Sequence, residues 1–107
     1  MKYFNDSFFK PSFEAYLGFA YALAGKWAEA EECLTNLQNV QHQYIPAYSF
    51  ALIYLGLGDL DKTFEWLEKA FAERSGFLPF LKVEPMFDAV RLDLRFQDLL
   101  HRVGLLP

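Results

Sequence analysis

The residue types that most often do chemistry are sparse in this sequence of 107 residues. Cys33 is the only cysteine, and His42 and His101 are the only histidines. A metal site needs several such ligands at short spacing, for example two histidines four residues apart. The wide separation of these three residues therefore argues against a metal site. We expect Cys33 to be a small core residue and both histidines to be solvated or capping residues.

Three carboxylates lie close together in the chain at Glu29, Glu31 and Glu32. Carboxylates act as general acid and base only in a cleft that restricts water and separates their pKa values. We expect these three to lie on the solvated face of a helix instead. The glycines at positions 25, 56 and 58 are interpreted as turn residues, so no phosphate-binding loop remains. The sequence thus predicts a protein that is not an enzyme and uses no cofactor and no metal.

The composition is unusually rich in apolar side chains for a single domain of this length, with 53% hydrophobic and 19% aromatic residues. A chain of this size does not hide all of them, so we expect some apolar surface to face a partner. The net charge of −4 argues against nucleic acid as that partner, because phosphates require clustered positive charge. Residues 11–73 carry three lysines and nine acids, a net charge of −6, whereas residues 74–107 carry a net charge of +1.

Several features bear on where the protein works. A single cysteine excludes an internal disulfide and suits a reducing compartment. The first ten residues, MKYFNDSFFK, lack the apolar core of a signal peptide, and no apolar run reaches the roughly 20 residues that span a bilayer. These observations predict a cytoplasmic location and no membrane contact.

Residues 47–71 predict a helical hairpin. Residues 47–57 are almost entirely apolar, and Gly58 and Asp59 then favour a helix end followed by the N-cap of a new helix. Apolar residues return at helical spacing in the second helix: Leu60, Phe64, Leu67 and Phe71. An apolar helix of this kind needs neighbouring helices to bury it.

A second hairpin of the same kind precedes the first by 33 residues. The offset pairs Gly18 with Ala51, Tyr21 with Tyr54, Gly25 with Gly58 and Leu34 with Leu67. The sequence therefore resembles the tetratricopeptide repeat family, whose pattern of apolar, small and aromatic positions is matched by Leu17, Gly18, Tyr21, Ala30 and Leu34, and again by Phe50, Ala51, Tyr54, Leu67 and Ala70. It departs from the pattern at Glu14 and Ala47, where the family has tryptophan, and at Thr63, where it has alanine.

The resemblance implies an all-α superhelix in one domain, residues 1–107. We divide it into an N-terminal segment (1–10), repeat 1 (11–43), repeat 2 (44–76), and a degenerate third repeat with a capping tail (77–107). Ser12 is expected to cap the first helix, Pro85 to break the third unit into short helical turns, and Asp93 and Gly104 to bound a final helix. This tail resembles the C-terminal region of repeat-containing bacterial multidomain regulators, so one alternative is a regulatory piece of a larger signalling protein.

In this family the first helices of successive hairpins line a concave groove that holds peptides. The residues that the resemblance places there are Ser12, Ala15, Phe19, Ala22, Ile45, Tyr48, Leu52 and Leu55. Because none of them is Lys, Arg or Asn, the groove is not expected to bind a carboxylate, and we expect an apolar peptide or helix from a protein partner. Two alternatives are a homodimer closed by exposed aromatic residues and a groove filled by the chain's own N-terminal segment.

Overall fold

The computed structural model describes residues 10–40 and 43–106, and within these ranges the regular elements are all helices, joined by turns and loops, with no strand. Residues 1–9 of the predicted N-terminal segment, and His42 with its predicted role, lie outside the described residues. The α-helices are α1 (Pro11–Leu23), α2 (Trp27–Asn39), α3 (Ala47–Leu57), α4 (Leu60–Ala72) and α5 (Leu94–Val103), with two 3-10 helices, η2 (Leu78–Phe80) and η3 (Pro85–Val90), between α4 and α5. The all-α class is therefore confirmed.

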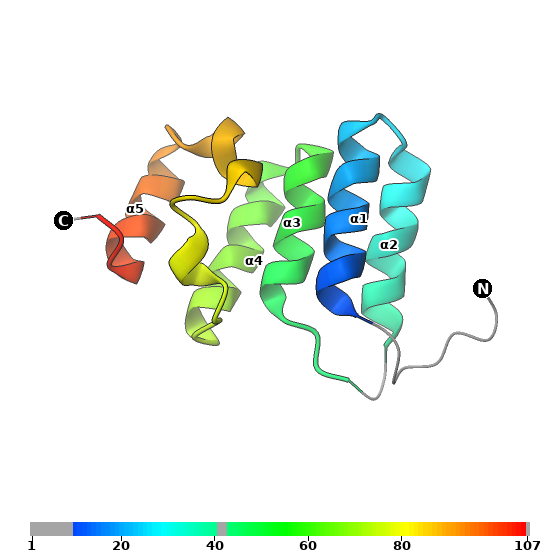
Figure 1. The fold of residues 1–107 in the computed structure, drawn as a ribbon, viewed down its shortest axis with the longest axis horizontal. Coiled ribbons are helices and arrows are strands. Elements are labelled where there is room, and N and C mark those ends of the chain that lie inside the picture. The colour runs from blue at the N-terminus through cyan, green and yellow to red at the C-terminus, as the bar shows by residue number, and fades with distance from the viewer. Residues whose placement is uncertain (1–9, 41–42, 107) are drawn as a thin grey trace.

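Two hairpins, α1–α2 and α3–α4, make up the first two thirds of the fold (Figure 1). Each hairpin turns at a glycine with a left-handed backbone, Gly25 at φ +78° and Gly58 at φ +81°, a conformation that glycine adopts without strain. Asp59 caps α4 as predicted, because its carboxylate accepts a hydrogen bond from the backbone N–H of Lys62 at 3.1 Å.

The two hairpins approach closely where α1 meets α3. A Cβ atom added to Gly18 would lie 2.8 Å from Cγ1 of Ile53. A Cβ atom added to Gly56 would lie 3.0 Å from both Cβ of Ala22 and the carbonyl oxygen of Phe19. The prediction that Gly56 is a turn residue is therefore wrong. It lies inside α3 and lets that helix reach the backbone of α1.

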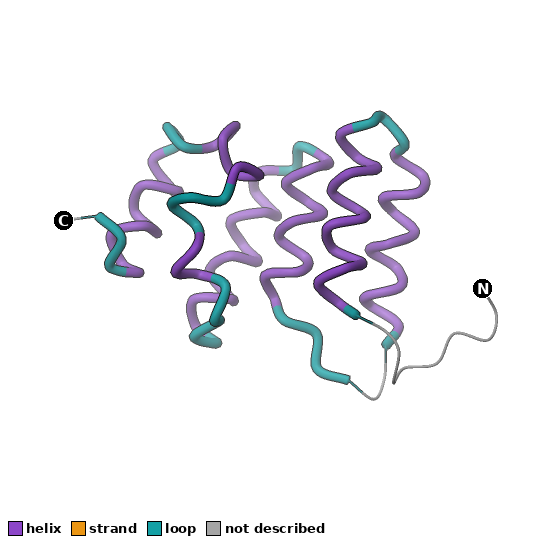
Figure 2. The backbone as a smooth tube through the Cα atoms, in the orientation of Figure 1, coloured by secondary structure: helices purple, strands orange, loops and turns teal. Residues whose placement is uncertain are grey.

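The C-terminal third consists of short helical turns followed by α5, as predicted (Figure 2). Arg91 holds the turns together, because its guanidinium donates hydrogen bonds to the carbonyl oxygens of Lys82 and Glu84, both at 2.7 Å. Asp93 caps α5 by accepting a hydrogen bond from the backbone N–H of Arg95 at 2.8 Å, and Gly104 ends the helix.

Other local predictions need correction. Ser12 does not cap the first helix: Lys10 is at the N-cap position, and Pro11 is the first helical residue, where its missing N–H costs no hydrogen bond. Trp66 packs on Phe50 of its own hairpin, with ring centroids 4.4 Å apart. None of the helices in the described part of the chain is long and apolar enough to cross a membrane.

Candidate functional site

The structure places most of the predicted groove residues inside the protein. Buried are Ala15, Ala22, Tyr48, Leu52 and Leu55; half-buried are Phe19 and Ile45; Ser12 is exposed. The five buried side chains contact the chain itself and offer a ligand no surface. The repeat-defining residues lie mainly in the core, with Gly18, Ala30, Leu34, Phe50, Ala51, Leu67 and Ala70 buried, Leu17, Tyr21 and Tyr54 half-buried, and Gly25 and Gly58 exposed in turns.

The C-terminal third covers α3 at Tyr48. The Tyr48 ring stacks on Phe77 with centroids 5.0 Å apart and planes 7° apart, and it also meets Phe87 at 6.1 Å. Burial raises the pKa of the Tyr48 hydroxyl above its ordinary value. The side of α3 that was expected to hold a peptide is therefore filled by residues 77–87. The alternative prediction, cover by the N-terminal segment, concerns residues outside the described ranges.

Helix α1 does present an open apolar surface, which we call the α1 face and define as Phe13, Tyr16, Ala20 and Leu23. The spacing of these four residues places them on one side of the helix. Phe13 is 65% exposed, Tyr16 41% and Leu23 67%, and Ala20 is exposed as well. Three of these four side chains, those of Phe13, Tyr16 and Leu23, are large and face solvent on a helix that is packed on two other sides.

The packing of α1 explains why this side is left open. Ala15, Gly18 and Ala22 lie against the second hairpin, and Leu17 and Tyr21 pack on the cluster that includes Leu37 of α2. Two neighbours thus hold α1 on two sides, and the α1 face is the remaining one. Helices α1 and α3 run side by side in Figure 1, with α1 farther from the C-terminal third.

The α1 face carries no charge. The one charged residue within α1 is Glu14, whose carboxylate lies off the face and accepts a hydrogen bond from Nδ2 of Asn36 at 2.9 Å. Partial burial, followed by the nearby Glu84 carboxylate, raises the pKa of Tyr16, so this phenol stays neutral at physiological pH. Trp27, the first residue of α2, is another exposed aromatic residue, with 52% of its surface open to solvent.

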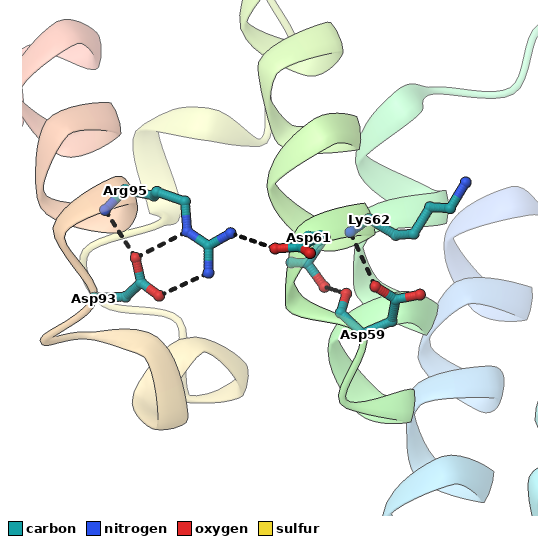
Figure 3. A network of polar contacts seen from close by, with 6 residues as sticks. Asp59, Asp61, Lys62, Asp93 and Arg95 are labelled. Atoms are coloured by element: carbon teal, nitrogen blue, oxygen red, sulfur yellow. Dashed lines mark hydrogen bonds and ion pairs between the residues drawn. The ribbon is translucent and has the colours of Figure 1, made fainter.

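The opposite end of the molecule is charged and internally paired. Arg95 of α5 reaches Asp61 of α4 at 2.9 Å and Asp93 at 3.0 Å (Figure 3). Arg102 of α5 pairs with Glu68 of α4 and lies over the ring of Phe71. Basic side chains of α5 thus pair with acidic side chains of α4.

The described residues contain no group of three or more His, Cys, Asp or Glu side chains that could hold a metal ion. Cys33 is buried as predicted, and burial, together with Glu14, raises the pKa of its thiol to about 12. A thiol that stays protonated is a poor nucleophile. The α1 face is therefore the feature of the described chain with the clearest potential for function.

Sequence reasoning missed this surface because it assigned the open side to Ser12, Ala15 and Phe19.

Comparison of the chain with protein-family models, with curated proteins and with solved structures finds no match in any of the three.

Proposed function

We propose that this protein is a non-enzymatic protein–protein interaction module that binds an apolar partner through the α1 face. One observation carries the proposal: Phe13, Tyr16 and Leu23, three large side chains without charge, are exposed together with Ala20 on one side of a helix that two neighbours hold in place. Single exposed apolar residues are common, but contiguous patches mark interaction sites. Exposed aromatic residues such as Phe13 and Tyr16 are well suited to anchor such a contact.

We also propose that the helices form a tetratricopeptide-like solenoid. The 33-residue offset and the small residues at the meeting of α1 and α3 support this architecture. A solenoid of this kind would supply a rigid surface, so the partner would bind by shape and apolar complementarity. The proposed site differs from the family's concave groove, because Tyr48 and Leu52 are buried.

A photoreactive phenylalanine analogue in place of Tyr16 tests this function in cells of the source organism. The matched control places the same analogue at Thr35, an exposed position on α2. We expect a discrete crosslinked protein at position 16 and none at position 35. Adding Leu23→Asp, an exposed change, should remove the crosslink while leaving the circular dichroism spectrum intact. Crosslinks of equal yield at both positions, or none at position 16, would refute the proposal.

A homodimer is the second candidate function, and the lack of charge on the α1 face favours it. The chain carries a net charge of −4, so most contacts between two copies would bring like charges together. Contact through two α1 faces would avoid this repulsion. Light scattering at high protein concentration distinguishes the two candidates: a mass that stays at 12.5 kDa, the mass of one chain, removes the homodimer.

A further inference from the structure

The C-terminal third of the protein forms an open cleft with the end of α4, which we call the C-terminal cleft. Four apolar side chains and two arginines line it: Phe71, Leu78, Pro79, Val103, Arg74 and Arg102. Its volume of about 490 Å³ lies within the range of roughly 300–1,000 Å³ that is typical of small-molecule sites. None of the residues of the α1 face lines this cleft, so it is a separate candidate site.

The two arginines of the cleft differ in their contacts. Arg102 pairs with Glu68 and Asp98, so two carboxylates already surround this one cation. Within the described part of the chain, Arg74 forms no ion pair and no side-chain hydrogen bond. Arg74 therefore brings to an apolar cleft a positive charge that no group of the protein neutralises.

The backbone of Arg74 makes arginine an unexpected residue at this position. Its φ of +56° is left-handed, whereas the left-handed residues at the ends of α1, α3 and α5 are glycines: Gly25, Gly58 and Gly104. This conformation is unfavourable for a residue with a Cβ atom. The α4 dipole does not require a cation here, because Lys69 already lies in the last turn. The stability of α4 therefore does not explain the arginine, and a strained residue of this kind points to a function.

We propose that the C-terminal cleft binds a small molecule with an apolar body and a single carboxylate, of the kind represented by a medium-chain fatty acid. The apolar body would contact Phe71, Pro79 and Val103. The carboxylate would accept hydrogen bonds from the planar guanidinium of Arg74, whose geometry matches it. A doubly charged head group such as a phosphate fits less well, because Glu68 and Asp98 outnumber the charge of Arg102 and would repel it.

Titration of the ¹⁵N-labelled protein with sodium octanoate, followed by NMR, tests this proposal. We expect saturable binding with a Kd below about 1 mM, and the largest shifts at the backbone amides of Phe71, Ser75 and Val103. The neutral analogue 1-octanol has the same chain length and should bind about tenfold more weakly, because it forms no charge-assisted pair with Arg74. No saturable binding of octanoate, equal affinity for octanol, or shifts centred on the α1 face would overturn the inference.

Two matched variants test the role of the arginine. Arg74→Gln removes the charge at the cleft and should weaken octanoate binding about tenfold. Lys82→Gln removes one positive charge from another exposed side chain, which does not line the cleft, and should leave the affinity unchanged. Equal effects of the two substitutions would overturn the inference, because no specific pair with Arg74 would then exist.

A third variant separates binding from folding. Arg74→Gly removes the guanidinium and also relieves the left-handed backbone, so it should weaken octanoate binding as Arg74→Gln does while unfolding at a Tm no lower than that of the parent. A lower Tm together with unchanged octanoate binding would assign Arg74 to the end of α4 alone and overturn the inference. These outcomes are independent of the crosslinking experiment, because the α1 face and the C-terminal cleft share no residue.

Discussion

The close approach of α1 and α3 makes Gly56 a sensitive position, and we predict that Gly56→Ala destabilises the protein. In an ordinary exposed helix the same change would be stabilising by about 1 kcal/mol, because alanine is the better helix former. Here the new methyl group would lie 3.0 Å from the Phe19 carbonyl oxygen, 3.1 Å from the Phe19 Cα and 3.0 Å from the Ala22 Cβ.

The size of the effect follows from which atoms are in the way. Two of the three neighbours belong to the backbone of α1, which has no rotamer to change, so the helices must separate. Overpacking of this kind costs about 1–3 kcal/mol, and we take the upper half of that range. Subtracting the gain in helix propensity leaves a net loss of about 1–2 kcal/mol, which corresponds to roughly 5–15 °C in Tm for a domain of this size.

Urea unfolding followed by circular dichroism measures the change. Gly76→Ala is the matched control: no atom lies within 4 Å of the added methyl group and the backbone is not left-handed, so we expect a change within about 0.5 kcal/mol. If Gly56→Ala instead raised the free energy of unfolding by about 1 kcal/mol, α1 and α3 would not be in close contact at this position, and the packing described above would be wrong.

Three further predictions concern side chains away from this contact. Cys33 should not react with iodoacetamide at pH 8 in the folded protein but should react fully in urea, because burial keeps the thiol protonated. Mass spectrometry measures the labelling, and rapid labelling of the folded protein would contradict this prediction. Hydrogen bonds from the side chain and the backbone N–H of Arg95 lower the pKa of Asp93. The ionised carboxylate therefore stabilises the folded protein at pH values above about 4, the pKa of an aspartate in the unfolded chain, and this stabilisation is lost as the pH falls. Asp93→Asn should therefore reduce the loss of stability measured between about pH 5 and about pH 2, and an unchanged acid profile would count against the contact. Arg102→Gln should lower the free energy of unfolding by about 1 kcal/mol or less, because the ion pairs of Arg102 with Glu68 and Asp98 are at the surface. The loss should be smaller still in 1 M salt, which screens such pairs. A loss of stability that does not depend on salt would assign the effect to packing of Arg102 on Phe71.

Much of the secondary structure was predictable because local signals encode it. The left-handed glycines at positions 25, 58 and 104 and the capping aspartates at 59 and 93 mark helix ends through interactions within a few residues. Gly18, which matches a small position of the repeat pattern, lies where α1 and α3 approach closely. Gly56 was misassigned, because a glycine near a helix end resembles a turn residue until the neighbouring helix is known.

The binding surface was harder to predict, because it depends on contacts between distant parts of the chain. The resemblance to the repeat family placed Tyr48 in a groove but did not show that Phe77 and Phe87 would cover that side of the helix. The 33-residue repeat offset does contain information about which side of α1 lacks a neighbour. It relates the exposed Tyr16 and Ala20 to buried positions of the second hairpin, which marks that side of α1 as a surface without a neighbour.

The most direct test of the account compares two positions that lie one repeat apart. In a Cys33→Ala background, Tyr16→Cys and Ser49→Cys each introduce a single thiol, and the rate of alkylation of the folded protein reports whether that thiol is open to solvent. We predict that the thiol at position 16 reacts about as fast as in an unfolded peptide and that the thiol at position 49 reacts at least about 100-fold more slowly. Equal rates, or faster reaction at position 49, would contradict the claim that the first hairpin leaves bare the side that the second has covered.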